Sequence, residues 1–239
     1  TGTSVYRLEQ DQLAELAPTV VITQTQCEVC AVSLKDVEQS VCDWSISVPT
    51  VVACAPNSLA DVWDDGRKIA AALGLEARGE ELIASLQARL KRVADACCSL
   101  GEPSPRVASI EWLEPLMAGG NWVPELIELV GGTSLFGVAG QHSPWMTWEA
   151  LRAADPEVII ALPCGYDLAK TTAEMHWLTE RSDWSALSAV QQGRIVVTDG
   201  NQYFNRPGPR LVESAEILAE VLYPGRLDFG HQGTGWKRF

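Results

Sequence analysis

The sequence has few basic residues and lacks long apolar runs. It carries 18 Lys and Arg against 31 Asp and Glu in 239 residues, which gives a formal net charge of −13. Nucleic-acid binders neutralise phosphates with clustered Lys and Arg, so we expect no nucleic-acid partner. Apolar runs such as those at residues 20–22 and 158–162 fall far short of the roughly 20 residues that a transmembrane helix needs. We therefore expect a soluble chain that does not span a membrane.

Known catalytic motifs are missing as well. The chain has no G-x-S-x-G, P-loop or G-x-G-x-x-G pattern, and its histidines, His142, His176 and His231, lie in unrelated contexts. Glu111 and Glu114 are close enough in sequence for an acid-base pair, but carboxylates three positions apart in a loop are usually solvated. We therefore predict that the protein is not an enzyme.

The composition is that of a globular protein. Hydrophobic residues make up 46% and charged residues 21% of the chain, enough for one large core or two small ones. Seven cysteines leave at least one thiol unpaired, or else indicate a reducing compartment. Residues 1–7 lack the apolar segment of a signal peptide, so cytoplasmic and extracytoplasmic locations both remain open.

Short β-branched runs alternate with amphipathic stretches along the chain. We expect strands at 19–23, 49–53, 106–110, 158–162 and 194–198, and helices at 59–74, 122–130, 148–153, 170–179 and 209–222. Asn57 or Ser58 is the expected cap of the first of these helices, and its expected inward residues are Leu59, Val62, Ile69 and Leu73. Strands that alternate with helices predict an α/β fold with mainly parallel sheets covered on both faces.

One long helix is expected between the two halves of the sequence. Its apolar stripe consists of residues spaced three or four apart, Leu82, Leu86, Leu90, Val93 and Cys97. The segment 101–105 follows, with two prolines that end the helix. We therefore predict an N-terminal α/β lobe at 1–76, an inter-lobe helix at 77–102, a C-terminal α/β lobe at 103–224 and a loosely packed tail at 225–239.

Loops that follow the strands are the places to search for a ligand site, because open α/β sheets bind ligands beyond the carboxyl ends of their strands. These loops are 24–30, 54–58, 111–122, 163–167 and 199–209. Aromatic and polar side chains that suit a flat ligand are Trp112, Trp122, Tyr203, Phe204 and Arg206, together with Trp145 beside His142. The alternative for each ring is packing on its own core. Trp148 is expected to pack, since Thr147 can cap a helix there.

Cys27 and Cys30 form a C-x-x-C pattern directly after the first expected strand. This spacing occurs in redox pairs and in half of a zinc site. A zinc ribbon needs a second pair at suitable spacing, which Cys97, Cys98 and Cys164 do not supply. Thiol chemistry, metal binding and simple packing all remain open for this pair.

Three stretches, in this order and spacing, carry a family resemblance. They are WLEPLMAGGNWVPELIELVGG at 112–132, SPWMTWEALRAADPEVII at 143–160 and DGNQYFNRPGPRLVE at 199–213. Over nearly its whole length the chain resembles the cobalamin-binding (vitamin B12-type) branch of class III periplasmic substrate-binding proteins, which serve ABC importers. The resemblance implies two Rossmann-like α/β lobes joined by one long backbone helix. It also implies one corrinoid held in the cleft without catalysis, and its delivery to the importer permease from a periplasmic or other extracytoplasmic location.

The resemblance assigns ligand contacts by position. The implied binding residues are Gln24, Gln26, Trp112, Pro115, Trp122, Trp145, Tyr203, Phe204 and Arg206. Aromatic residues of the family's first lobe fall near Gln24 and Ala53, where this chain has none. The family's first strand, helix and strand, about 70 to 80 residues at ordinary element lengths, have no counterpart before Ser4. The resemblance therefore implies an incomplete first lobe.

Two other functions stand beside cobalamin binding. The same fold suits haem, a siderophore or a bare metal, bound through His142, Cys27 and carboxylates. A thiol protein or enzyme that uses Cys27 and Cys30 is the second alternative. For delivery, the acidic chain is expected to dock on a basic permease face. The candidate contacts are Glu28, Glu111 and Glu114.

Overall fold

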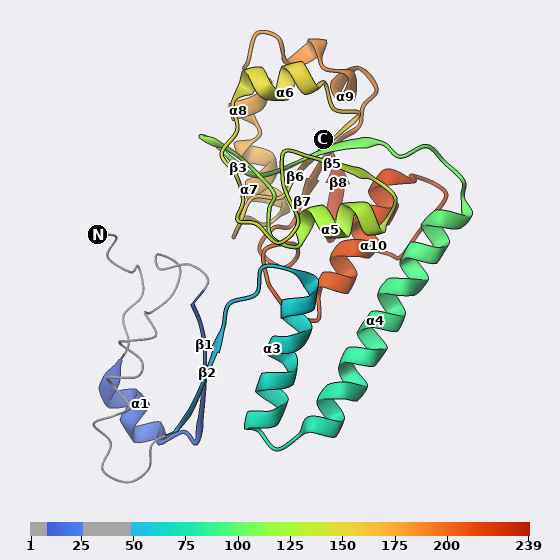
Figure 1. The fold of residues 1–239 in the computed structure, drawn as a ribbon. Coiled ribbons are helices and arrows are strands. Elements are labelled where there is room, and N and C mark those ends of the chain that lie inside the picture. Colours follow the sequence, from blue (N-terminus) through green and yellow to red (C-terminus); the bar gives the residue numbers. More distant parts are fainter. Residues whose placement is uncertain (1–8, 26–48) are drawn as a thin grey trace. The chain divides into compact units, whose positions relative to one another are not determined.

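The chain divides into two units inside one long helix, between Ala84 and Ser85 (Figure 1). The computed structural model describes residues 9–25 and 49–239. The long helix, α4 (Glu76–Ser99), lies where the apolar stripe predicts it. The lobe boundaries at 76 and 102 stay a prediction. Both units combine helices with parallel strands, which confirms the α/β class.

In the first unit, two strands pair in parallel. Its described elements are α1 (Gln10–Leu16), β1 (Val20–Gln24), β2 (Thr50–Cys54), α3 (Leu59–Ala72) and the beginning of α4. The pairing runs from Val20 opposite Thr50 to Gln24 opposite Cys54. Both strands therefore end at the same edge, where Gln24 is exposed.

A capping box begins α3. The Ser58 hydroxyl accepts the backbone N–H of Asp61 (3.2 Å), and the Asp61 carboxylate accepts the backbone N–H groups of Asn57 and Ser58, each at 2.9 Å. These bonds favour the ionised form and hold the pKa of Asp61 below its usual value. The predicted cap is thus confirmed at Ser58. Leu73, expected to point inward, instead lies past the helix end and is 50% exposed.

The buried stripe of α4 starts one residue later than the sequence predicts. Ile83, Leu90, Val93 and Cys97 are buried, whereas Leu82 is 51% exposed. At 3.6 residues per turn, the two steps of four residues from Leu82 to Leu90 rotate the side chain by about 80°. The seven-residue step from Ile83 to Leu90 drifts by only about 20°. Ile83 therefore shares the face of the later residues, and Leu82 does not.

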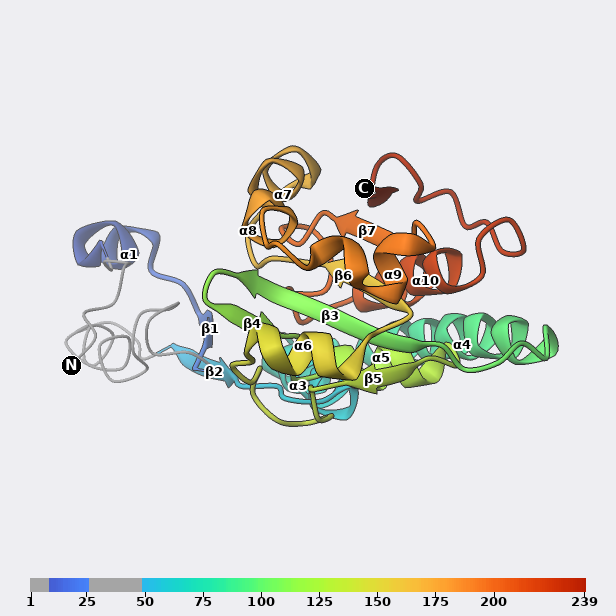
Figure 2. The ribbon, with the colours of Figure 1, turned by 90° about the horizontal axis from the view of Figure 1, so that it is seen from above.

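A six-stranded sheet forms the second unit, with the strand order β4-β3-β6-β7-β8 and with β5 beside β3 (Figure 2). Its strands are β3 (Arg106–Leu113), β4 (Leu116–Ala118), β5 (Thr133–Leu135), β6 (Val158–Ala161), β7 (Ile195–Thr198) and β8 (Trp236–Arg238). β5, β3, β6 and β7 are parallel, while β4 and β8 run antiparallel to their neighbours. The sequence predicts β3, β6 and β7, but none of the three-residue strands.

Helices pack on this sheet. They are α5 (Val123–Leu129), α6 (Trp148–Ala154), α7 (Leu168–Glu174), α8 (His176–Thr179), α9 (Ser188–Gln191) and α10 (Leu211–Leu222), with a 3₁₀ turn η1 (Trp184–Ala186). Ile110, Ile159 and Val197 of the sheet form one buried cluster with Leu151 of α6 and Leu178 of α8. The single helix expected at 170–179 is two helices, α7 and α8. Nowhere in residues 9–25 and 49–239 does a helix combine the length and the apolarity of a membrane span.

The C-terminal segment 225–239 is anchored to the second unit, although most of its residues are exposed, which corrects the prediction of a loose tail. Its strand β8 pairs with β7, and Trp236 is only 3% exposed. The Trp236 indole N–H and the backbone N–H groups of Phe229 and His231 all donate to the Glu220 carboxylate of α10. A buried carboxylate therefore fixes the segment to the helix.

Candidate functional site

Parallel strands β3, β6 and β7 of the second unit end on the same side, and we term this region the strand-end edge. It comprises residues 111–118, 162–167 and 199–206. The Asn205 amide donates to the carbonyl oxygens of Leu162 (2.9 Å) and Gly200 (3.0 Å). The backbone N–H of Asn201 donates to the Tyr166 carbonyl (3.1 Å). These bonds join the loops after β6 and β7 into one surface.

Trp112, Met117 and Trp145 lie on neighbouring strands at this edge. Trp112 pairs with Met117 in the β3–β4 register, and Met117 pairs with Trp145 across an antiparallel bridge. Trp145 is 66% exposed, and Pro115 is exposed in the turn between β3 and β4. Residues opposite each other in antiparallel strands have neighbouring side chains. Three of the predicted ligand contacts, Trp112, Pro115 and Trp145, therefore gather at one place, which we term the aromatic hairpin.

Tyr166 extends this aromatic surface, although sequence reasoning did not single it out. Its ring centroid lies 5.3 Å from that of Trp112, with an angle of 57° between the ring planes. The Lys170 ammonium lies 3.8 Å from the Tyr166 ring centroid. The Trp112 indole N–H donates to the carbonyl of Glu114 (3.1 Å), which holds the indole in place. The signal for Tyr166 was its position in the loop directly after β6.

Tyr203 and Arg206 lie on the loop after β7 and have protein partners. The half-buried Tyr203 ring meets His231 edge-on, with 6.1 Å between the centroids, and the Arg210 guanidinium lies 5.9 Å from the Tyr203 centroid. Burial raises the pKa of Tyr203, so its hydroxyl keeps its proton at neutral pH. Arg206 is exposed and donates to the backbone and side-chain oxygens of Asn201, both at 3.0 Å. Its guanidinium is therefore held in a fixed position at the edge.

Trp122 and Phe204 are core residues, which corrects the expectation of an open ring face at both positions. Trp122 is 3% exposed, and Phe204 is fully buried. The Trp122 indole N–H donates to the Phe204 carbonyl, and the Phe204 backbone N–H donates to the Ser214 hydroxyl (3.0 Å). The two residues connect the start of α5 to the loop after β7 from inside the unit. Their structural role is packing.

The remaining predicted residues are in the first unit. Gln24 ends β1 and is exposed, while Gln26, Cys27, Glu28 and Cys30 lie outside the described residues. Of the described cysteines, Cys54, Cys97 and Cys98 are free thiols. Burial raises the pKa of Cys97 to about 11, which keeps it a neutral thiol. Within the described part of the chain, no group of three or more His, Cys, Asp or Glu side chains is placed to hold a metal ion.

Glu111 and Glu114 have separate partners. The Glu111 carboxylate accepts a hydrogen bond from the Ser143 hydroxyl (2.8 Å), and that hydroxyl accepts the Gly120 backbone N–H (3.1 Å). Burial raises the pKa of Glu111. Glu114 is exposed and forms an ion pair with Arg181 (2.9 Å). The structure therefore does not bring the two carboxylates together as an acid-base pair.

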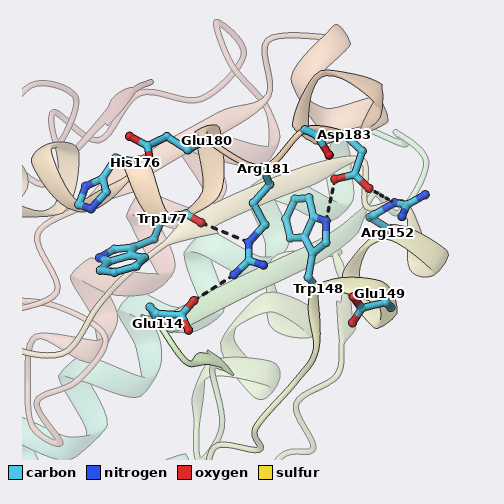
Figure 3. A pocket seen from close by; sticks show the side chains of 10 residues that line it. Glu114, Trp148, Glu149, Arg152, His176, Trp177, Glu180, Arg181 and Asp183 are labelled. Atoms are coloured by element: carbon cyan, nitrogen blue, oxygen red, sulfur yellow. Dashed lines mark hydrogen bonds and ion pairs between the residues drawn. The ribbon is translucent and has the colours of Figure 1, made fainter.

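A hollow of about 540 Å³, which we term the Trp177 hollow, shares Glu114 with the turn between β3 and β4 (Figure 3). Its other walls come from α6, α8 and residues 180–183. Asp183 accepts the Trp148 indole N–H (2.8 Å) and pairs with Arg152 (2.7 Å). None of its residues is a predicted ligand contact. Its walls are mostly helical, whereas most predicted contacts lie in the loops after strands.

Sequence comparison identifies relatives of this chain. The profile of a family described as periplasmic binding protein matches residues 4–202. The uncharacterized ABC transporter substrate-binding lipoprotein YvrC of Bacillus subtilis (strain 168) is 24% identical over 222 residues. This match covers 90% of the chain and 65% of YvrC, so the chain spans slightly less than two thirds of that relative.

Solved structures share the fold. The periplasmic heme-binding protein RhuT from Roseiflexus sp. RS-1 is 24% identical, with a TM-score of 0.71 over 92% of this chain and 81% of RhuT. The periplasmic vitamin B12 binding protein BtuF of Vibrio cholerae is 18% identical, with a TM-score of 0.65 over 90% of this chain and 78% of BtuF. Likeness at these identities shows the two-lobe α/β fold and leaves the ligand of this chain open.

Proposed function

We propose a transport role for this chain, which belongs to the periplasmic binding protein family. In this role it binds a small molecule outside the cytoplasm and delivers it unchanged to the permease of an ABC importer. The similarity to YvrC, described as an ABC transporter substrate-binding lipoprotein, supports this role. Such a protein needs a surface that recognises its ligand, and no group that transforms it.

The observation that carries the proposal is the aromatic hairpin. Trp145 leaves 66% of its surface in water, and the Trp112 and Tyr166 rings lie 5.3 Å apart at the same edge. An aromatic side chain buries roughly 150 to 250 Å² when it is covered, so these rings can supply much of the affinity for a flat ligand. Exposed apolar groups that gather at one place are typical of binding sites.

For the ligand we propose a corrinoid, cobalamin or a close relative. The three stretches that resemble the cobalamin-binding branch include the aromatic hairpin and the loop after β7, and BtuF is named a vitamin B12 binding protein. Tyr203 and Arg206 add a hydroxyl and a fixed guanidinium for polar groups at the ligand rim. Gln24 is the proposed polar contact from the first unit.

Haem is the second candidate, and His142 is the observation that favours it. His142 is exposed three residues before Trp145, and its Nδ1 lies 3.0 Å from the Ser143 carbonyl. That contact leaves Nε2 as the nitrogen that can bind haem iron. RhuT, a similar fold, is named a heme-binding protein.

Titration of the purified chain with cyanocobalamin, and separately with haemin, distinguishes the two. If the ligand is a corrinoid, cyanocobalamin quenches Trp fluorescence at one site, and Trp145→Ala weakens binding about tenfold. Trp177→Ala, which removes an exposed indole outside the aromatic hairpin, is the matched control and leaves the affinity unchanged. A haemin Soret band that His142→Ala abolishes assigns haem instead. No quenching by either compound well above micromolar concentration rejects both.

A further inference from the structure

Positive charges in the Trp177 hollow are already neutralised by the protein. Arg181 pairs with Glu114 (2.9 Å), and its Nε–H donates to the Trp177 carbonyl (3.3 Å). Arg152 pairs with Asp183 (2.7 Å). An incoming anion would have to displace a carboxylate that is already in contact. The hollow is therefore poorly suited to an anionic ligand.

Three further side chains of its lining, Glu149, Glu180 and His176, offer acceptors. Within the described part of the chain, the exposed carboxylates of Glu149 and Glu180 have no ion-pair partner. The His176 Nδ1 is bonded to the Ala173 carbonyl (2.9 Å), which leaves Nε2 as an acceptor in the neutral ring. Four carboxylates against two arginines give the lining a formal charge of −2. The carboxylates of Glu149 and Glu180 and Nε2 of His176 are therefore suited to a cation that has N–H donors.

Trp177 supplies an apolar face next to these acceptors. Its side chain is 44% exposed, and its indole N–H is already bonded to the Glu174 carboxylate (3.1 Å). What it offers a ligand is therefore the negative face of its ring. Trp148 differs, because it is 8% exposed and packs against Trp184, with 6.4 Å between centroids.

The sequence of α8 brings the aromatic face and the acceptors together. His176 and Glu180 are four residues apart and Trp177 and Glu180 are three apart, spacings that make side chains neighbours on one turn of helix. Figure 3 shows Trp177 and His176 next to each other on one side of Arg181, with Trp148 on the other side. Trp177 and Glu180 thus line the same side of the hollow as His176.

We infer that the Trp177 hollow binds a small organic cation, a primary ammonium or guanidinium group joined to an apolar body. The body covers the Trp177 ring, and the N–H groups donate to Glu180 and to Nε2 of His176. The cation also gains from the ring quadrupole of Trp177. A volume of about 540 Å³ lies within the range of roughly 300 to 1,000 Å³ for small-molecule sites. The proposed contacts of this site, Trp177, Glu180 and His176, are not residues of the aromatic hairpin, and the inference does not depend on the proposed corrinoid.

Calorimetric titration with benzylamine tests the inference, with benzoate and benzyl alcohol as the charge-reversed and neutral controls. Benzylamine is expected to bind at one site, and the two controls are not. Trp177→Ala weakens benzylamine about tenfold, and Glu180→Gln weakens it about fivefold. Trp145→Ala, the matched loss of an exposed indole elsewhere, leaves benzylamine affinity unchanged, although it weakens the proposed corrinoid.

Equal binding of benzyl alcohol and benzylamine would overturn the inference, as would benzylamine binding that survives Trp177→Ala. Circular dichroism of each variant confirms that it is folded. The peptide acetyl-Gly-Arg-Gly-amide then distinguishes two sources of the same chemistry. Tighter binding of the peptide than of benzylamine assigns the hollow to a basic side chain of a partner protein, and the reverse assigns it to a free amine.

Discussion

Glu111 is a carboxylate whose ionisation the fold opposes. Burial raises its pKa, and the hydrogen bond from Ser143 offsets only part of that effect. Glutamine has the same shape and keeps an acceptor for the Ser143 hydroxyl without a charge. We predict that Glu111→Gln increases the free energy of unfolding at neutral pH and changes it little in acid.

Linkage gives the sign of this prediction. A carboxyl whose pKa is higher in the folded than in the unfolded chain adds stability at low pH, and this stability is lost as the pH rises through the folded pKa. Urea denaturation of both proteins at about pH 3 and about pH 7, either side of the ordinary Glu pKa, measures the difference. An equal gain at both pH values would contradict the buried-charge explanation.

Exposure separates aromatic residues that look alike in the sequence. Trp122 and Trp145 both lie in segments that contain glycine or proline and precede a helix, yet one is 3% and the other 66% exposed. The Trp122 indole is buried, and its N–H donates to the carbonyl of Phe204, 82 positions along the chain. Local pattern predicts that aromatic residues lie near the strand ends. The local pattern does not predict which of these rings is buried, because burial involves partners that are distant in sequence.

The contact between α3 and α4 in the first unit requires glycine at position 79 but not at position 66. A Cβ atom at Gly79 of α4 would lie 2.5 Å from the Cβ atom of Ala70 in α3, whereas one at Gly66 would lie 3.5 Å from Ile83. We predict that Gly79→Ala lowers the free energy of unfolding by about 1 to 3 kcal/mol, because the helices must move apart. Gly66→Ala is the matched control, and it should raise stability by up to about 1 kcal/mol through helix propensity. Urea denaturation that shows equal effects would refute the close contact.

Strand β8 places Trp236 of the C-terminal segment in the core. We predict that Trp236→Ala costs about 3 to 5 kcal/mol of unfolding free energy, because it leaves a cavity and removes a donor from Glu220. Phe239→Ala alters an aromatic residue next to the same strand that is 47% exposed, and it should cost less than about 0.5 kcal/mol. Similar losses for the two variants, measured by urea denaturation, would show that the segment is not anchored at Trp236.

Element length decides how much of the fold the sequence predicts. β3, β6 and β7 contain runs of β-branched residues, and α4 has an apolar stripe over about four turns, so their patterns are strong. The three-residue strands β4, β5 and β8 are too short to show an alternation. Their pairing depends on turns and on distant partners such as Glu220. Because β8 is this short, the sequence pattern alone predicts a loose segment at 225–239.

At the scale of the whole molecule, the fold can be predicted and the ligand cannot. Alternating strands and helices with one long helix indicate two α/β lobes, and the similarity to RhuT and BtuF confirms that fold. The fold sets where strands end, but the ligand depends on the few side chains placed there. The side chains proposed here come from hairpin and loop residues, whose exposure the sequence pattern does not determine. The net charge of −13 is consistent with the proposed docking to a basic permease face.

Protection of the aromatic hairpin by its ligand tests the central claim most directly. Hydroxyl-radical footprinting with mass spectrometry compares the oxidation of Trp145 with that of Trp177, two exposed indoles of the second unit. With cyanocobalamin or haemin at saturation, we predict strong protection of Trp145 and unchanged oxidation of Trp177. Unchanged oxidation of Trp145 in the ligand-bound protein would contradict the claim that the strand-end edge is the binding site.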